Sequence, residues 1–288
     1  MNKILYGKEV SESIESELDD KAKILKEKGV NPKLAIVRVG ENPGDMFYEK
    51  AACKKAEKLG IGHVNIAFDK DITQDELIKT INELNEDKNI HGILLLRPFP
   101  KHMDDDEVRN AVAPKKDIDG ITDTSLTGLI TGKHKGFVPC TPKACLEILK
   151  YYGYSLEGKN VTIIGRSLVI GKPLSLLMTT HNANVTVCHS KTKKEDMIKH
   201  CTGADILVLA TGKTESFTHD YLGDGQVIID VGTGVGKNGK MAGDLDINEV
   251  YESKINELAI TPVPKGVGSV TTAVLMSNLI LAAEKKPD

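Results

Sequence analysis

A glycine-rich junction between a strand and a helix constrains this chain more than any other feature. Residues 161–173 read VTIIGRSLVIGKP: an apolar run ends at Gly165, a polar loop follows, and Gly171 and Pro173 stand where a helix should begin. Proline suits a first helical turn, because the amide hydrogen that it lacks has no helical partner there. Such a junction directs backbone N–H groups and the positive end of a helix dipole at one point, which favours a phosphate. The spacing differs from G-x-G-x-x-G, so a plain strand-to-helix connection is the alternative interpretation.

The overall composition is that of a soluble globular protein. The 288 residues are 40% hydrophobic and 27% charged, with a net charge of −3, and this length suits one large domain or two ordinary ones. The negative charge argues against a general nucleic-acid-binding protein. No apolar run approaches the roughly 20 residues of a membrane helix, and the apolar part of the N-terminus is too short for a signal peptide. We therefore expect a cytoplasmic protein with no membrane or nucleic-acid partner.

Cysteine and histidine spacing gives no sign of a metal centre. The five cysteines are odd in number and form no C-x-x-C pair, and the eight histidines form no H-E-x-x-H motif. This usage is typical of a reducing cytoplasm, and we expect no bound metal.

Hydrophobic periodicity predicts helices and strands in alternation. In the first half we expect helices over 8–28, 45–59 and 145–152, and another after the capping box at Thr73–Glu76. We expect strands over 33–39, 63–68 and 90–96, and an irregular segment over 114–142. In the second half we expect strands over 161–164, 185–188, 206–210 and 227–231, helices over 173–181, 193–202 and 270–284, and a hairpin turn at Asn238-Gly239. This order predicts an α/β protein with two α/β lobes around a cleft, the second a Rossmann-like dinucleotide-binding domain.

Loops at the carboxyl ends of these strands carry an ordered series of motifs along the whole chain. They are Gly40-Glu41-Asn42-Pro43 followed by Tyr48, Gly92-Ile93-Leu94 with Pro98 and Pro100, Lys116-Asp117-Ile118-Asp119-Gly120, Pro139-Cys140-Thr141-Pro142, the Gly165 junction, Ile229-Asp230-Val231-Gly232 and Thr261-Pro262-Val263-Pro264. With this series the chain resembles the methylenetetrahydrofolate dehydrogenase/cyclohydrolase family, the bifunctional folate enzymes of one-carbon metabolism.

The resemblance implies an organisation in two domains and usually a homodimer. It implies a folate (catalytic) domain over residues 1–141, with the C-terminal helix over 270–288 packing back on it, and an NAD(P)-binding Rossmann-like domain over 142–269. The implied reaction is transfer of a hydride from 5,10-methylenetetrahydrofolate to NADP, which gives 5,10-methenyltetrahydrofolate. The carbon cation so formed is delocalised over two nitrogens, so this step needs no general base.

The resemblance also carries site residues onto this chain. Tyr48 and Asp119 match the catalytic and folate-binding positions, and Pro264 and Gly268 lie in a loop expected to contact the substrate. A loop-capping role is the alternative for Asp119. The expected cofactor residues are Gly165, Arg166, Ser167, Gly171, Pro173, Ser190, Lys191, Thr211, Gly212 and Gly232.

The loop after the second strand of the nucleotide domain favours NADP over NAD. NAD-selective Rossmann folds place an acid about 20 residues past the first glycine, but here the sequence from Cys188 reads CHSKTKK, and Glu195 is the first acid. Arg166 and Lys191 suit a 2′-phosphate. A solvated helix start is the alternative for the lysines. Some relatives keep the arginine and use NAD, so NAD stays possible.

The chain departs from the family where the cyclohydrolase reaction should occur. The family uses a lysine four residues after the tyrosine and a glutamine near the end of the Gly-Ile-Leu strand. These positions are Ala52 and Leu96 here. We therefore expect weak or absent cyclohydrolase activity. Lys55 lies about two helical turns after Tyr48 and is the alternative general base, which would leave the enzyme fully bifunctional.

Other departures keep two further interpretations open. Lys265 stands where the family has a glycine, Ser269 where it has a proline, and Ser125 where it has an asparagine. After Asp-Val-Gly the chain has Thr233-Gly234 in place of the family's Ile-Asn. An oxidoreductase acting on another substrate, and a non-catalytic paralogue that binds a dinucleotide, are therefore alternatives to the folate dehydrogenase.

Overall fold

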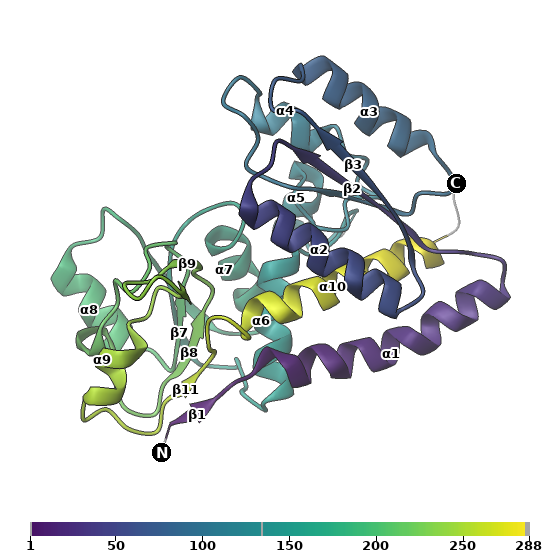
Figure 1. Cartoon of the computed structure of the whole chain (residues 1–288). Coiled ribbons are helices and arrows are strands. Elements are labelled where there is room, and N and C mark those ends of the chain that lie inside the picture. The colour runs from purple at the N-terminus through teal and green to yellow at the C-terminus, as the bar shows by residue number, and fades with distance from the viewer. Residues whose placement is uncertain (1, 134, 286–288) are drawn as a thin grey trace. The chain divides into compact units, whose positions relative to one another are not determined.

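The computed structural model describes residues 2–133 and 135–285, which form two compact units. Unit 1 combines residues 1–11 with 141–271, and unit 2 combines residues 12–140 with 272–288. Figure 1 shows the elements of both units. Each unit contains a parallel sheet, so the predicted α/β class is confirmed.

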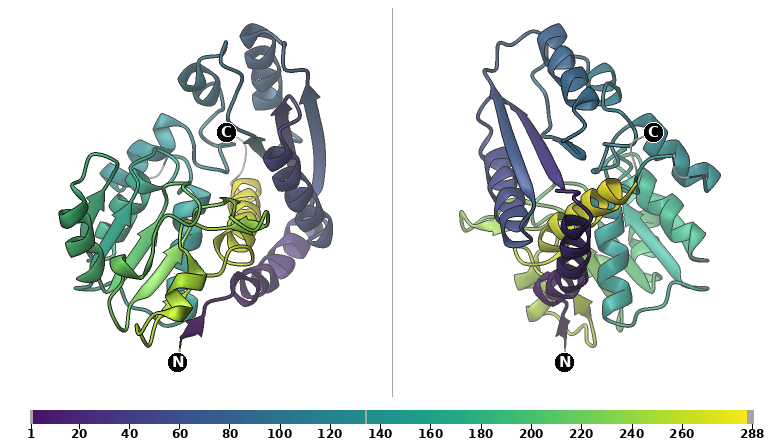
Figure 2. Two further views of the ribbon diagram at one scale, coloured as in Figure 1. Left: turned by 60° about the vertical axis from the view of Figure 1, so that its left-hand side comes forward. Right: turned by 90° about the vertical axis from the view of Figure 1, so that its right-hand side faces the viewer.

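Unit 1 is built on a six-stranded parallel sheet in the order β1-β11-β8-β7-β5-β6. Figure 2 shows this sheet in a second view. Both faces of a parallel sheet are normally covered, which explains why every residue of β7 and β8 is buried. The strands are β1 (Lys3–Ile4), β5 (Asn160–Ile164), β6 (Asn184–Cys188), β7 (Ile206–Leu209), β8 (Val227–Asp230) and β11 (Ala259–Ile260).

The remaining elements of unit 1 connect these strands. A short antiparallel hairpin turns at Asn238-Gly239, as predicted, with Gly239 at a φ of 75°. The elements are α6 (Cys140–Tyr151), α7 (Gly171–Thr180), α8 (Lys194–Thr202), the 3-10 helix η1 (His219–Tyr221), β9 (Gly234–Val235), β10 (Met241–Ala242) and α9 (Ile247–Glu252).

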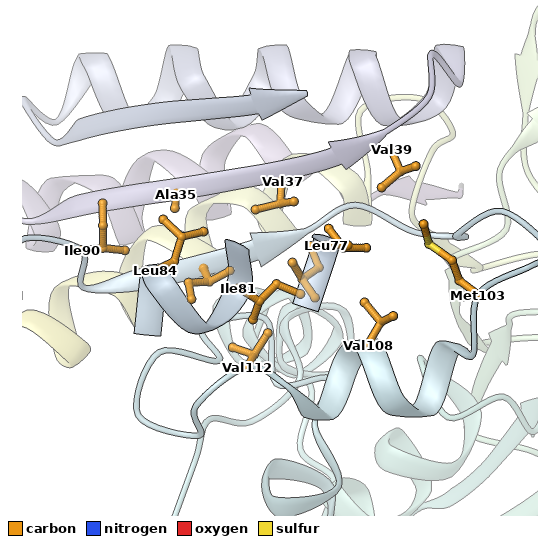
Figure 3. Packing of buried hydrophobic residues seen from close by; sticks show 12 residues of the cluster. Ala35, Val37, Val39, Leu77, Ile81, Leu84, Ile90, Met103, Val108 and Val112 are labelled. Carbon is orange, nitrogen blue, oxygen red and sulfur yellow. The ribbon is translucent and has the colours of Figure 1, made fainter. Parts of the chain in front are cut away.

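Unit 2 is built on a three-stranded parallel sheet in the order β3-β2-β4. One cluster of buried apolar side chains joins β2 and β4 to α3 and α4, and Figure 3 shows Val37, Leu77, Ile81 and Val108 among them. The elements that lie wholly or mostly in unit 2 are α1 (Gly7–Glu27), β2 (Lys33–Val39), α2 (Pro43–Lys58), β3 (Gly62–Phe68), α3 (Gln74–Glu86), β4 (Gly92–Leu95), α4 (Asp105–Asn110), α5 (Asp123–Thr131) and α10 (Val267–Glu284).

Helix α10 is apolar over almost its whole length. Within the described residues it alone is long and apolar enough to suit a membrane, and 67% of that 18-residue window is buried inside the protein. A helix that is hydrophobic all round belongs in a protein core as readily as in a bilayer. The predicted helix over 270–288 begins three residues earlier than expected, and its residues 286–288 lie outside the described residues.

The predicted irregular segment over 114–142 is partly wrong, because it contains α5 and the start of α6. The Thr122 side chain caps α5 by accepting from Ser125 N, and Gly132 ends it in the left-handed conformation. Threonines and a glycine inside α5 have low helix propensity, so the local sequence does not predict this helix. Helices α4 and α9 have only six residues each, too few to show a period.

Candidate functional site

The glycine junction of unit 1 forms a close backbone approach. Gly165 has a φ of 134°, and a Cβ atom there would lie 2.4 Å from the Ala210 carbonyl oxygen. A Cβ atom on Gly171 would lie 2.1 Å from the Gly165 carbonyl oxygen. Both positions therefore require glycine.

Helix α7 starts directly after this junction, at Gly171 rather than at the predicted residue 173. Pro173 lies in its first turn, as expected. Ile170 at the N-cap offers no side-chain cap, and the first turn holds no acidic residue. The start of α7 is therefore suited to an anion by its dipole and by the lack of a competing carboxylate.

The sheet order places this junction at a topological switch point. Strand β5 pairs with β6 on one side and with β7 on the other. Ligands of doubly wound sheets bind beside the carboxyl ends of the two strands at such a point. The loop after β5 carries Gly165, and the loop after β7 carries Thr211 and Gly212, so topology brings these predicted cofactor residues to one sheet edge.

The loop after β6 carries positive charge, and no acidic residue lies at the end of that strand. Ser190, Lys191 and Arg166 are all exposed, and the Gly165 amide donates to the Cys188 carbonyl at 2.9 Å. The first acidic residues, Glu195 and Asp196, lie in the first turn of α8. This arrangement fits a nucleotide that carries a 2′-phosphate better than a bare ribose.

Pro264, in the loop before α10, and Gly268, in the first turn of α10 rather than in a loop as expected, also belong to unit 1. Lys265, in a position where the resemblance expects glycine, has a φ of 83°, and its carbonyl accepts from Gly7 N at 2.8 Å. Gly268 is exposed, with open space where a Cβ atom would be. Pro264 and Gly268 thus lie in a different unit from Tyr48 and Asp119.

Unit 2 brings Tyr48 and Asp119 into electrostatic range of each other. Tyr48 lies on α2, which begins at the Asn42 cap, and Asp119 lies in the loop before α5. Both side chains are half-buried. Burial raises the pKa of Tyr48 well above its usual value, and the negative charge of Asp119 raises it further. Tyr48 therefore stays a neutral hydrogen-bond donor near neutral pH.

The carboxyl group of Asp119 has an unusual protonation equilibrium. Burial, and then the charge of Asp117, raise its pKa to about 6, while a hydrogen bond with Cys140 and the charge of Arg97 act in the opposite direction. Asp117 is buried and accepts hydrogen bonds from Ile121 N, Thr122 N, Thr122 Oγ1 and Ser125 Oγ. Asp117, rather than Asp119, is therefore the carboxylate that caps this loop.

Sequence reasoning missed two neighbours of Asp119. Cys140 belongs to a motif that supported the resemblance, but no role was predicted for it. Its backbone amide donates to the Asp119 carbonyl at 3.2 Å. Asn278 of α10 donates from Nδ2 to the Ile118 carbonyl at 2.8 Å and to Cys140 Sγ at 3.5 Å. A buried asparagine in an otherwise apolar helix was the available signal for Asn278.

The two positions of unit 2 where the resemblance expects a lysine and a glutamine are buried and apolar. Ala52 is 0% exposed and Leu96 is 5% exposed. Lys55, the alternative base, donates from Nζ to Glu15 Oε1 on α1 at 2.5 Å. Lys58 pairs with the other oxygen of Glu15 at 2.6 Å. The Lys55 ammonium is thus engaged by a buried carboxylate on another helix.

Residues 2–133 and 135–285 contain no cluster of three or more histidine, cysteine or acidic side chains that could hold a metal ion.

Comparisons with known proteins give matches over nearly the whole chain. Residues 5–119 match the model of the tetrahydrofolate dehydrogenase/cyclohydrolase catalytic domain, and residues 139–287 match that of the NAD(P)-binding domain. The bifunctional protein FolD of Clostridium botulinum (strain Langeland) is 45% identical over 285 residues, which cover 99% of each chain. The FolD of Clostridioides difficile (strain 630) is 42% identical, covering 98% of this chain and 96% of the relative.

Solved structures give the same result. The bifunctional FolD methylenetetrahydrofolate dehydrogenase/cyclohydrolase of Campylobacter jejuni superposes with a TM-score of 0.93 at 37% identity, covering 99% of both chains. The Trypanosoma brucei enzyme, solved with NADP cofactor and an inhibitor, superposes with a TM-score of 0.91 at 28% identity, covering 98% of this chain and 97% of that one.

Proposed function

Since this chain belongs to the tetrahydrofolate dehydrogenase/cyclohydrolase family, we propose that it is an NADP-dependent methylenetetrahydrofolate dehydrogenase with weak or absent cyclohydrolase activity. The dehydrogenase role and the choice of NADP agree with the relatives and with the phosphate-suited start of α7. The proposed loss of hydrolysis is inferred from this chain's own residues. The observation that carries it is the burial of apolar side chains at both Ala52 and Leu96.

The two reactions place different demands on the protein. NADP, when bound, accepts the hydride from the methylene carbon of the folate. The protein has to orient the substrate and tolerate the cation, and Tyr48 and Asp119 are the residues we assign to folate binding. Hydrolysis of the methenyl product is harder, because water must be activated and protons must move. An alanine and a leucine can do neither.

Lys55 is poorly placed to replace the missing lysine. The Lys55 side chain is 15% exposed, and its ammonium pairs with Glu15, whose side chain is 8% exposed and binds Lys58 as well. Removing one partner of a buried ion pair leaves an uncompensated charge, typically at a cost of about 3–5 kcal/mol. A Lys55 side chain that turned toward the substrate would have to give up its ion pair with the buried Glu15.

Several assignments complete the proposal. We assign folate binding to residues 1–141 with the C-terminal helix over 270–288, and NADP binding to residues 142–269. Family membership supports a cytoplasmic homodimer. The cofactor residues are those of the α7 start, the β6 end and the loops after β7 and β8: Gly165, Arg166, Ser167, Gly171, Pro173, Ser190, Lys191, Thr211, Gly212 and Gly232. Pro264 and Gly268 complete the substrate set.

One purified sample tests the proposal. Reduction of NADP and NAD with 5,10-methylenetetrahydrofolate is measured in parallel, followed by hydrolysis of 5,10-methenyltetrahydrofolate. We expect turnover with preference for NADP and hydrolysis far slower than hydride transfer. Comparable rates of hydrolysis and hydride transfer would contradict the loss of the second activity. Cofactor binding without turnover on any reduced folate would favour the non-catalytic paralogue.

A double substitution tests the cause. Ala52→Lys with Leu96→Gln should raise hydrolysis by about 100-fold or more, the usual contribution of a placed acid–base group, and keep hydride transfer. Ala51→Lys with Leu96→Gln is the matched control, because residue 51 points about 100° away around α2. Equal gains in both variants, or no gain in either, would show that positions 52 and 96 do not limit hydrolysis.

A further inference from the structure

The loops after β7 and β8 are joined by a pair of buried carboxyl groups that no predicted role accounts for. Asp230 ends β8 and is 3% exposed, and Asp244 follows the β9–β10 hairpin and is 0% exposed. Neither has a lysine, arginine or histidine partner among the ion pairs of the described residues. Burying carboxyl groups without a cation is costly, so their hydrogen bonds must account for their presence.

Asp244 binds the loop after β7 through a single oxygen. Its Oδ2 accepts from Thr211 N at 2.6 Å, from Thr211 Oγ1 at 2.8 Å and from Gly212 N at 3.2 Å. Thr211 and Gly212 are the two residues of this loop that we assign to the cofactor. Hydrogen bonds from backbone amides to a carboxylate are among the stronger ones in proteins.

Asp230 extends the same network to the loop after β8. Its Oδ1 accepts from Gly232 N at 3.0 Å and from Asp244 N at 3.1 Å, and its Oδ2 accepts from Leu245 N at 2.9 Å. Burial, and to a lesser extent the charge of Asp244, raise the pKa of Asp230 to about 7. The two carboxyl groups are therefore close enough to interact.

The second oxygen of Asp244 explains the glycine at position 232. A Cβ atom on Gly232 would lie 2.1 Å from Asp244 Oδ1, and this oxygen has no hydrogen-bond partner among the described residues. A buried acceptor without a partner lowers stability. The hydrogen bonds of the Asp244 carboxyl group within the described residues are therefore all at Oδ2, on the Thr211–Gly212 loop.

We propose that Asp244 is a positioning residue for NADP: its carboxylate holds the Thr211–Gly212 loop, and through Asp230 the Gly232 turn, in the conformation that binds the cofactor. The inference rests on the proposed NADP-dependent turnover. It assigns Asp244 no contact with folate and no part in hydride transfer. Loss of its carboxylate should therefore weaken NADP binding, with little effect on turnover at saturating NADP.

The test compares Asp244→Ala, Asp244→Asn and a matched control in the full-length enzyme. Asp246→Ala is the control, because Asp246 is also buried and lies two residues away, but it caps α9 and pairs with Lys237 at 2.6 Å. The readouts are KM for NADP, KM for methylenetetrahydrofolate, kcat, and NADP affinity by calorimetry.

We expect Asp244→Ala to raise KM for NADP by about tenfold or more, the effect of losing about 1.4 kcal/mol of binding. The folate KM and kcat should stay within about threefold of wild type, as should all parameters of Asp246→Ala. Asp244→Asn should rescue part of the affinity, because its amide oxygen can still accept from Thr211 N.

An unchanged KM for NADP in a folded Asp244→Ala protein would overturn the proposal, as would an equal rise in Asp246→Ala. If the alanine variant does not fold, Asp244→Asn decides: a severalfold rise in KM for NADP alone supports the proposal, and wild-type kinetics overturn it. A wild-type enzyme that neither binds nor reduces NADP would instead refute the proposed function, a result visible before any variant is made.

Discussion

Asp119 should lower the stability of unit 2 at neutral pH, and its replacement should show this directly. The pKa of its carboxyl group rises from 3.8 to about 6 in the folded protein. Because one pKa unit corresponds to about 1.4 kcal/mol, the ionised carboxylate lowers the free energy of unfolding by about 3 kcal/mol at most. Protonated Asp119 carries no such penalty.

The direction of the pH dependence follows from the sign of this pKa change. The folded state binds the Asp119 proton more tightly than the unfolded state, so this contribution to stability is complete below about pH 4 and is lost as the pH rises through 6. Asp119→Asn removes the titration. The variant should match the wild type near pH 4 and exceed its free energy of unfolding by about 2–3 kcal/mol at pH 7.5.

Activity should move in the opposite direction from stability. Loss of a charged hydrogen-bonding group from the site that we assign to folate should lower kcat/KM for methylenetetrahydrofolate by about 10- to 100-fold. The assay combines steady-state kinetics with urea unfolding from pH 4.5 to 8, followed by amide hydrogen exchange in β2 and β4 so that unit 2 is observed by itself. A less active but more stable variant cannot be explained by misfolding.

Asp117→Asn is the matched control, two residues away. The Asp117 carboxylate accepts four hydrogen bonds within the loop through its two oxygens. The asparagine side chain has only one oxygen, so it cannot accept all four. Burial also raises the pKa of Asp117, but the loss of these hydrogen bonds should outweigh the removal of a buried charge, so this variant should be less stable than the wild type at pH 7.5. If Asp119→Asn is also destabilised at pH 7.5, or if its advantage does not change with pH, the assigned burial and charge repulsion of Asp119 are wrong.

Two further substitutions test how the sites are held. Gly165→Ala should lower the melting temperature and weaken NADP binding by at least about tenfold, because the new methyl group would meet the Ala210 carbonyl oxygen at 2.4 Å with φ at 134°; normal NADP titration and normal thermal unfolding would contradict this. Asn278→Leu should cost about 1–3 kcal/mol, because it leaves the Ile118 carbonyl with only the weak thiol donor of Cys140. It should also raise KM for methylenetetrahydrofolate while leaving KM for NADP unchanged, and a change in both would show that Asn278 acts on more than the Asp119 loop.

Local sequence patterns predicted most of the regular structure. The capping box at Thr73 and Glu76 is formed with both of its hydrogen bonds. The apolar runs became buried parallel strands, and the expected turn at Asn238-Gly239 is a hairpin. Each of these features depends on residues within a few positions of one another. The sequence did not predict α4 and α9, because six residues are too few to show a helical period. It did not predict α5, because the residues of α5 have low helix propensity.

By itself, the sequence determined the glycine junction at Gly165 and the apolar side chains of Ala52 and Leu96, because backbone conformation and helical register are encoded locally. The tertiary structure alone decided which side chains pair with which. Lys55 pairs with Glu15 from 40 positions earlier, and Asp244 binds Thr211 across 33 positions. Burial, pKa and choice of partner depend on side chains that only folding brings together.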